Sequence, residues 1–175
     1  DADLVYVPRN YIGEVLNVTD LYKPFPLPEL VVDAFFFNQN IGEDSEYIGS
    51  GALDGNGIPK DFFTDIDVRK GFNYAFDFET YIRDAMQGEA KQMGSPVIEG
   101  LLYYNPNTPK YTFDLTKATE HLKAAWGGQV WEKGFKFTLT YNTGNIPRKT
   151  ACEILAENML AINEKFQIIG RPTTW

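Results

Sequence analysis

The chain has 175 residues, 43% of them hydrophobic, so it is long and apolar enough to bury one core, and one domain is expected. Its formal net charge of -8 argues against a surface that follows nucleic-acid phosphates or docks on anionic lipid. Aromatic residues make up 15% of the chain, which predicts that some of them line a surface groove. No apolar run approaches the roughly 20 residues of a membrane span and no signal segment opens the chain, so we expect a mature protein or a piece of one.

The first sixty residues predict two strands, a connector between them and a long loop. Residues 3–7 read as a short buried strand, and one or two helical turns are expected within residues 8–16. Three alternate prolines from Pro24 onward exclude a helix and predict an extended connector. Residues 30–40 are β-branched and aromatic on both alternate faces, which predicts a central strand covered on two sides. Residues 41–61 are Gly-rich and polar and predict a loop.

The stretch from Thr64 to Asp77 predicts a capped amphipathic helix. Thr64 is expected to be the N-cap, and Asp65 and Asp67 place negative charge at the positive end of the helix dipole. One apolar stripe is formed by four residues at i, i+4, i+7 and i+8: Val68, Phe72, Ala75 and Phe76. Gly71 indicates either a close backbone approach or simple tolerance, since Gly in a helix costs roughly 1 kcal/mol relative to Ala.

Two further helices are expected before residue 130. A short helix over residues 78–87 should end at Gly88 in a left-handed cap. Asp114 is expected to cap the next helix, which Gly127 and Gly128 should end.

The last part of the chain predicts a strand, a turn, a helix and a strand. Residues 135–141 alternate apolar and polar side chains, as in a strand with one covered face, and residues 142–145 form the turn. Pro147 fits the first turn of a helix, and residues 166–169 predict the final strand. Strands and helices in alternation predict an α/β fold with a central mixed sheet on which the helices pack.

Two single residues bear on chemistry. Cys152 is the one cysteine and lies among apolar residues of a predicted helix, which favours a small buried hydrophobe over a nucleophile. His121 is the one histidine, without a Cys or second His nearby in sequence, and is expected to be a surface or half-packed side chain. No nucleophile elbow, metal-spaced cluster or phosphate loop occurs, so we expect no enzyme, no metal and no cofactor.

Several stretches resemble the extracellular solute-binding proteins of family five, the peptide- and nickel-type binding components of ABC importers. Residues 65–77, read as D-x-x-V-R-x-x-x-N-Y-A-x-D, resemble the signature helix of that family, which usually has Arg where Asp67 stands and Ala where Gly71 stands. The helix that Asp114 opens and the later succession of strand, turn Y-N-x-G-N, Arg148, helix and strand also resemble it. The resemblance covers nearly the whole chain.

The resemblance implies a receptor with a two-lobed periplasmic-binding-protein-like fold. Residues 1-31 would be the tail of the first lobe or a connector, and residues 32-175 a partial second lobe. Such a protein captures oligopeptides or dipeptides outside the cytoplasm and delivers them to the membrane permease of an ABC importer. The resemblance also implies a periplasmic or cell-surface location with a lipid or membrane anchor on the full-length protein. The negative charge and the lack of a long apolar run predict neither nucleic-acid binding nor membrane insertion by this stretch.

Residues at the ends of strands are the candidates for ligand contact, because ligands in open α/β sheets bind beyond the strand ends. Amides would bond a peptide backbone or sugar hydroxyls, and aromatic rings would stack on side chains or sugar faces. The candidates are Phe37, Asn38, Tyr103, Tyr104, Tyr141, Asn142 and Asn145. The asparagines of the turn can equally serve only to shape it and cap the next helix. An oligosaccharide importer and a protein-interaction module stay open as alternatives.

Overall fold

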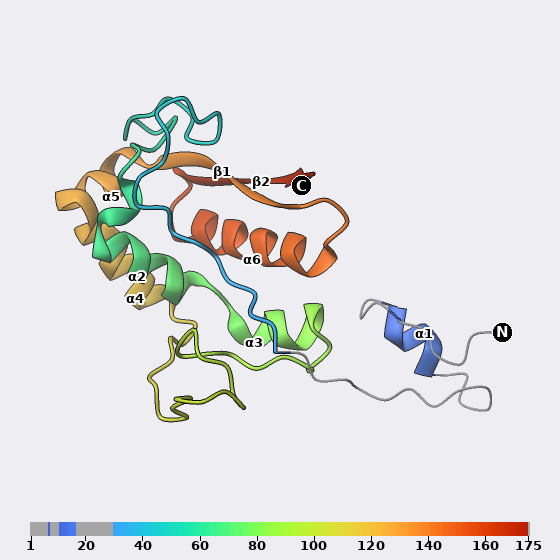
Figure 1. Ribbon diagram of the computed structural model, residues 1–175. Coiled ribbons are helices and arrows are strands. Elements are labelled where there is room, and N and C mark those ends of the chain that lie inside the picture. Colours follow the sequence, from blue (N-terminus) through green and yellow to red (C-terminus); the bar gives the residue numbers. More distant parts are fainter. Residues whose placement is uncertain (1–6, 8–10, 17–29, 175) are drawn as a thin grey trace.

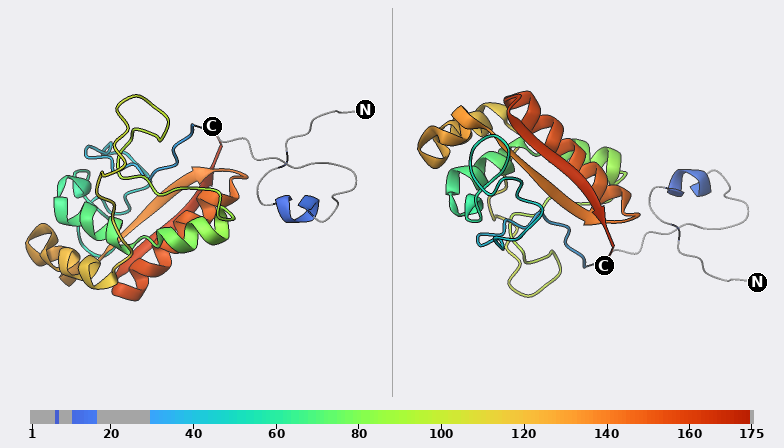
Figure 2. Two further views of the ribbon diagram at one scale, coloured as in Figure 1. Left: turned by 90° about the horizontal axis from the view of Figure 1, so that it is seen from below. Right: turned by 90° about the horizontal axis from the view of Figure 1, so that it is seen from above.

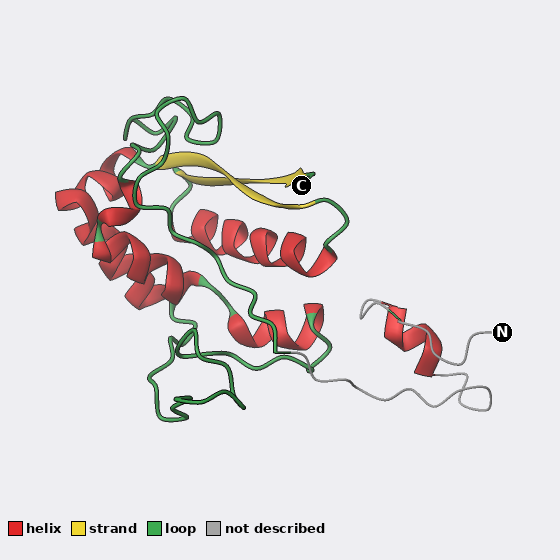
Figure 3. Ribbon diagram, viewed as in Figure 1, coloured by secondary structure: helices red, strands yellow, loops and turns green. Residues whose placement is uncertain are grey.

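The computed structural model describes residue 7 and residues 11–16 and 30–174 (Figure 1). Helices, loops and a small sheet make up this part of the chain (Figure 3). The helices are α1 (Ile12–Leu16), η2 (Phe62–Thr64), α2 (Ile66–Ala75), α3 (Phe78–Thr80), η3 (Tyr81–Ala85), α4 (Leu115–Ala124), η4 (Ala125–Gly128), α5 (Gln129–Lys133) and α6 (Ile146–Ile162). The strands are β1 (Phe135–Asn142) and β2 (Phe166–Thr173). The predicted α/β class is confirmed, whereas the strand expected over residues 3–7 lies outside the described residues except for Val7.

A β–α–β unit forms one half of the body. β1 and β2 are parallel neighbours in a register that runs from Phe135 opposite Phe166 to Asn142 opposite Thr173. Helix α6 connects the two strands and packs against the sheet (Figures 1 and 2). The rings of Phe135 and Phe166 stack with their centroids 4.7 Å apart, and both side chains are fully buried. Within the described residues the sheet consists of this parallel pair, so it is smaller than the mixed sheet that the sequence predicted.

Helices α2 and α4 form the other half and pack against each other. The predicted apolar stripe of α2 is buried, and so are Ala118 and Leu122 of α4. Gly71 lies where the two helices are in contact, because a Cβ added to it would be 2.7 Å from Leu122 Cγ. Of the two explanations that the sequence left open for this glycine, close approach is the one that the structure supports.

The N-cap of α2 is Asp65, so the prediction that Thr64 caps this helix is wrong. Asp65 Oδ1 accepts hydrogen bonds from Asp67 N at 2.7 Å and from Val68 N at 3.4 Å. The Thr64 hydroxyl instead donates to a backbone carbonyl three residues earlier, at 2.7 Å. Asp65 Oδ2 accepts a further bond from Trp126 N at 2.7 Å, so one carboxylate joins α2 to η4. A hydroxyl, with its single oxygen, is less suited to this double role.

The prediction of a central strand over residues 30–40 is also wrong, since this segment has no regular structure. Phe36 is 89% exposed, and Phe37 packs against the core. The edge of β1 that faces away from β2 is partly taken by the following loop, where Thr138 N donates to Tyr47 O at 2.8 Å. Strand propensity expresses packing against a neighbouring strand, and this segment has no such neighbour among the described residues.

Three other predicted elements are present, the two helices among them with altered ends. The loop over residues 41–61 is confirmed and contains one isolated bridge. The helix expected over residues 78–87 is present as α3 followed by η3, a π-helix, and Gly88 beyond it has a φ of 77°. Asp114 caps α4 as predicted, but α4 ends at Ala124, before the two glycines, because Ala125 at its C-cap has a non-helical ψ of 136°; Trp126 beyond it takes a left-handed φ of 51°.

The single cysteine and the single histidine are placed as predicted. Cys152 is 3% exposed on α6, and burial raises the pKa of its thiol to about 11. His121 is half-buried; its Nδ1 lies 2.8 Å from Asp67 Oδ1, and its ring stacks on Tyr74 with centroids 5.7 Å apart. Asp67 therefore links α2 to α4.

Candidate functional site

Polar side chains gather where β1 ends and α6 begins. β1 ends at Asn142, the chain turns at Gly144 with a φ of 82°, and α6 starts at Ile146. Asn145 is the N-cap of α6, because its Oδ1 accepts a hydrogen bond from Arg148 N at 3.0 Å. This turn brings the positive end of the α6 dipole to the carboxyl end of β1.

The guanidinium group of Arg148 joins two other segments of the chain at this point. Its Nη1 donates to Asn142 Oδ1 at 3.0 Å, while Nε and Nη2 both donate to Asp33 Oδ1, at 3.0 and 2.8 Å. The side chains of Arg148 and Asp33 are 42% and 38% exposed. A guanidinium that solvent reaches and that neighbours hold in place is suited to bind a carboxylate or phosphate.

Tyr81 lies near this cluster. It opens the π-helix η3, is half-buried, and packs against Phe76 with ring centroids 5.6 Å apart. Burial raises the pKa of its phenol; the charge of Asp33 raises that pKa further, and the charge of Arg148 lowers it. π-Helical turns occur frequently at functional sites. We therefore include Tyr81 in the candidate site.

Three of the seven predicted site residues meet at this end of β1. Asn142 binds Arg148, and Asn145 caps the helix that carries Arg148. Tyr141 precedes them, is half-buried, and lines a shallow groove between β2 and α6 that also includes Cys152.

The other four predicted residues lie elsewhere. Phe37 is half-buried against core aromatic rings, and Asn38 shapes its own segment by accepting a hydrogen bond from Asn40 N at 3.0 Å. Tyr103 is 87% exposed with a left-handed φ of 69°, whereas Tyr104 is half-buried. The structure gives no contact between these four residues and Arg148.

Sequence reasoning did not select Asp33, Tyr81 or Arg148. The position of Arg148 in the first turn of a helix after a strand was an available signal. No signal in the sequence indicated Asp33, because its segment was predicted as a strand. We can identify no sequence pattern for the π-helical turn at Tyr81.

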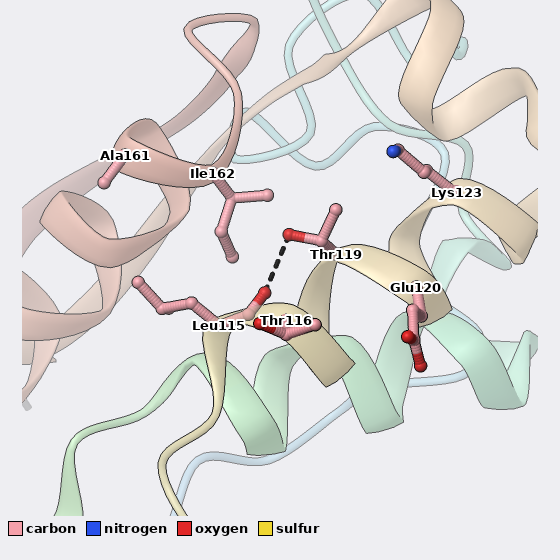
Figure 4. Close-up of a pocket in the computed structure, with 7 residues that line it drawn as sticks. All are labelled: Leu115, Thr116, Thr119, Glu120, Lys123, Ala161 and Ile162. Carbon is pink, nitrogen blue, oxygen red and sulfur yellow. Dashed lines mark hydrogen bonds between the residues drawn. The ribbon is translucent and has the colours of Figure 1, made fainter.

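A second hollow lies between α4 and the end of α6 that is remote from Arg148 (Figure 4). It measures about 460 Å³ and is lined by Leu115, Thr116, Thr119, Glu120, Lys123, Ala161 and Ile162. The Thr119 hydroxyl already donates to Leu115 O at 2.7 Å. No predicted site residue lines this hollow, and its lining offers no cluster of groups that converge on one point.

Two findings concern other kinds of site. Among the residues that the structure describes, no three His, Cys, Asp or Glu side chains are placed to hold a metal ion. None of the described helices is both long and apolar enough to cross a membrane.

An α/β unit with polar side chains gathered at the carboxyl end of a parallel strand has the arrangement of a small-molecule binding domain. Comparison with known families agrees, because the model of the bacterial extracellular solute-binding proteins, family 5 Middle, matches residues 2–175. The chain belongs to this family, and the resemblance stated from its sequence is confirmed. The family is one of extracytoplasmic binding proteins rather than of enzymes.

The individual proteins to which the chain is similar share only a minority of its residues. The chain is 30% identical over 76 residues to the probable D,D-dipeptide-binding periplasmic protein DdpA of Escherichia coli (strain K12), covering 43% of this chain and 14% of DdpA. It is similar to the solved structure of DppA from Helicobacter pylori in complex with peptide STSA, at 21% identity and a TM-score of 0.53, covering 95% of this chain and 27% of that one.

A second solved structure is NikA from Brucella suis in complex with Fe(III)-EDTA, at 19% identity and a TM-score of 0.52, covering 64% of this chain and 24% of that one. At these identities the two structures show a shared fold. The chain thus spans about a quarter or less of the length of these relatives.

Proposed function

We propose that this chain is part of the substrate-binding component of an ABC importer and that its solute is a peptide. Membership of family 5 supports the binding role, and DppA of Helicobacter pylori is described as an ABC transporter-associated periplasmic binding protein in complex with a peptide. In this proposal residues 32-175 form part of the second lobe, and residues 1-31 lead into it. The full-length protein that contains the chain, called the parent protein below, is anchored outside the cytoplasm and delivers its solute to a permease.

The observation that carries the proposal is the accessible guanidinium of Arg148 at the carboxyl end of β1. A peptide ends in a carboxylate, which an arginine binds through charge-assisted hydrogen bonds. Asn142 uses its side-chain oxygen on Arg148, which leaves its NH₂ group to donate to a peptide carbonyl.

The remaining contacts belong to the aromatic and amide positions that the sequence selected. In the proposed complex Tyr141 lies beside the bound peptide, and the more distant positions contact its side chains or main chain as the lobes close. These positions are Phe37, Asn38, Tyr103, Tyr104 and Asn145.

The test is calorimetric titration of the parent protein with the tripeptide Ala-Ala-Ala. Arg148→Gln should weaken binding about tenfold to hundredfold, because hydrogen bonds to a charged group contribute about 1.5–3 kcal/mol. Arg171→Gln is the matched control, since Arg171 is also a half-exposed arginine in an ion pair, 3.1 Å from Glu46. Equal weakening by both substitutions, or none by Arg148→Gln, would contradict the role of Arg148.

An oligosaccharide solute is the alternative that this titration also addresses. The names of the relatives given above refer to peptides and a metal chelate, and to no saccharide. Binding of maltotriose in place of the tripeptide would favour the saccharide.

A further inference from the structure

The segment of residues 30–37 is held to the body mainly by aromatic side chains. Phe35 packs edge-on against Phe76, with ring centroids 5.5 Å apart, and Phe37 packs against Phe63 at 5.3 Å. Among the described hydrogen bonds and ion pairs, those between Asp33 and Arg148 are the ones that tie this segment to the rest of the structure. Among the described residues, the segment is therefore tied to α6 by one charged contact, in addition to its aromatic packing on the body.

That contact occupies the side of Arg148 that a solute carboxylate would need. Asp33 Oδ1 accepts from both Nε and Nη2, the two groups that form a bidentate pair with an incoming carboxylate. The third group, Nη1, is held separately by Asn142, and the Arg148 backbone is fixed by the Asn145 cap. Arg148 can thus exchange one carboxylate for another while its guanidinium stays in place.

Because the ion pair of Asp33 and Arg148 is exposed, breaking it requires little free energy. Both side chains of the pair are more than one third exposed, and exposed ion pairs contribute little to stability. When the carboxylate of a solute replaces that of Asp33, Arg148 is still paired with one negative charge.

We propose that Asp33 is an internal competitor that occupies Arg148 in the solute-free protein and is replaced there by the carboxylate of the solute. This inference rests on the proposed function and adds a specificity-determining residue to the same site. The replacement frees residues 30–37 at their charged contact, so solute binding and the position of this segment are coupled. Asp33 then sets the affinity for solutes with a free carboxylate and leaves the affinity for their amides unchanged.

The experiment compares Ala-Ala-Ala with its C-terminal amide by calorimetry on the parent protein. Asp33→Asn and Asp33→Ala should tighten binding of the acid about twofold to fivefold, the range that loss of an exposed ion pair provides, with no change for the amide. Glu46→Gln is the matched control, because it removes one negative charge that is also paired with an arginine. Equal tightening for the amide, or by Glu46→Gln, would overturn the inference in favour of a general charge effect; unchanged or weaker acid binding in the Asp33 variants would also overturn it.

A second measurement separates this inference from the proposed function. NMR of the arginine Nε–H groups, without peptide, should show faster exchange of the Arg148 proton with water in Asp33→Asn than in wild type. Sodium acetate should shift this signal at a lower concentration in the variant. If the protein does not bind the tripeptide while both NMR results hold, the proposed function fails, and the competition between Asp33 and a carboxylate for Arg148 stands. If exchange and acetate response are the same in both proteins, the competition is overturned.

Discussion

Replacement of Asp65 tests how the structure holds α2 and η4 together. Asp65→Ala removes the N-cap of α2, which costs about 1 kcal/mol in typical helices. It also leaves the Trp126 N–H, now 2.7 Å from Asp65 Oδ2, without its partner in a half-buried place, at about 1–3 kcal/mol. The two effects together predict a loss of about 2–4 kcal/mol in the free energy of unfolding.

Two matched variants separate the cap of α2 from the link to Trp126. Asp65→Asn keeps one acceptor oxygen for the cap and loses the acceptor of the Trp126 N–H, so it should lose about 1–3 kcal/mol. Thr64→Ala removes an exposed hydroxyl and should lose less than about 1 kcal/mol. The assay is urea unfolding of the 175-residue chain, followed by circular dichroism and tryptophan fluorescence. If Thr64→Ala costs as much as Asp65→Ala, the sequence-based cap is right and the structural one wrong; if Asp65→Asn costs nothing, the link to Trp126 contributes nothing.

Three further predictions concern packing and pH. Gly71→Ala should destabilise the chain by about 1 kcal/mol in urea unfolding, because overpacking against Leu122 exceeds the gain in helix propensity, and a Leu122→Val background should reduce this loss. Phe135→Ala in the buried stack should cost about 3–5 kcal/mol and Phe36→Ala less than about 0.5 kcal/mol, and comparable losses would show that the core is misplaced. Burial raises the pKa of the Cys152 thiol from 9.0 to about 11. The difference in unfolding free energy between wild type and Cys152→Ala should therefore be constant below pH 9, fall as the pH rises toward 11 and then level off. A difference that does not change from pH 8 to 11 would refute the burial of the thiol.

Local patterns predicted most of the helices and both strands, and long-range contacts account for what they missed. Asp114 caps α4 as predicted, because a cap involves backbone groups two and three residues away. Asp65 displaces Thr64 as the cap of α2 partly through Trp126, 61 residues further along the chain. The segment over residues 30–40 has strand-like composition but no adjacent strand to pair with, and composition does not reveal that.

In the candidate site, too, local patterns predicted some residues, whereas long-range contacts determine the others. Asn142 and Asn145 could be selected because ligand sites follow strand ends, and the structure places both around Arg148. Asp33 reaches Arg148 across 115 residues of sequence, so no local pattern could pair them. Tyr81 reaches the cluster through a π-helical turn that the helical periodicity of its segment did not indicate.

Native mass spectrometry of the gently purified parent protein can identify the solute that the protein carries. The experiment releases and identifies any molecule that copurifies with the protein. We expect intact peptides with free carboxyl ends at one per protein, and their loss in Arg148→Gln. A saccharide, a chemically altered solute or a stoichiometric protein partner in place of peptide would contradict it.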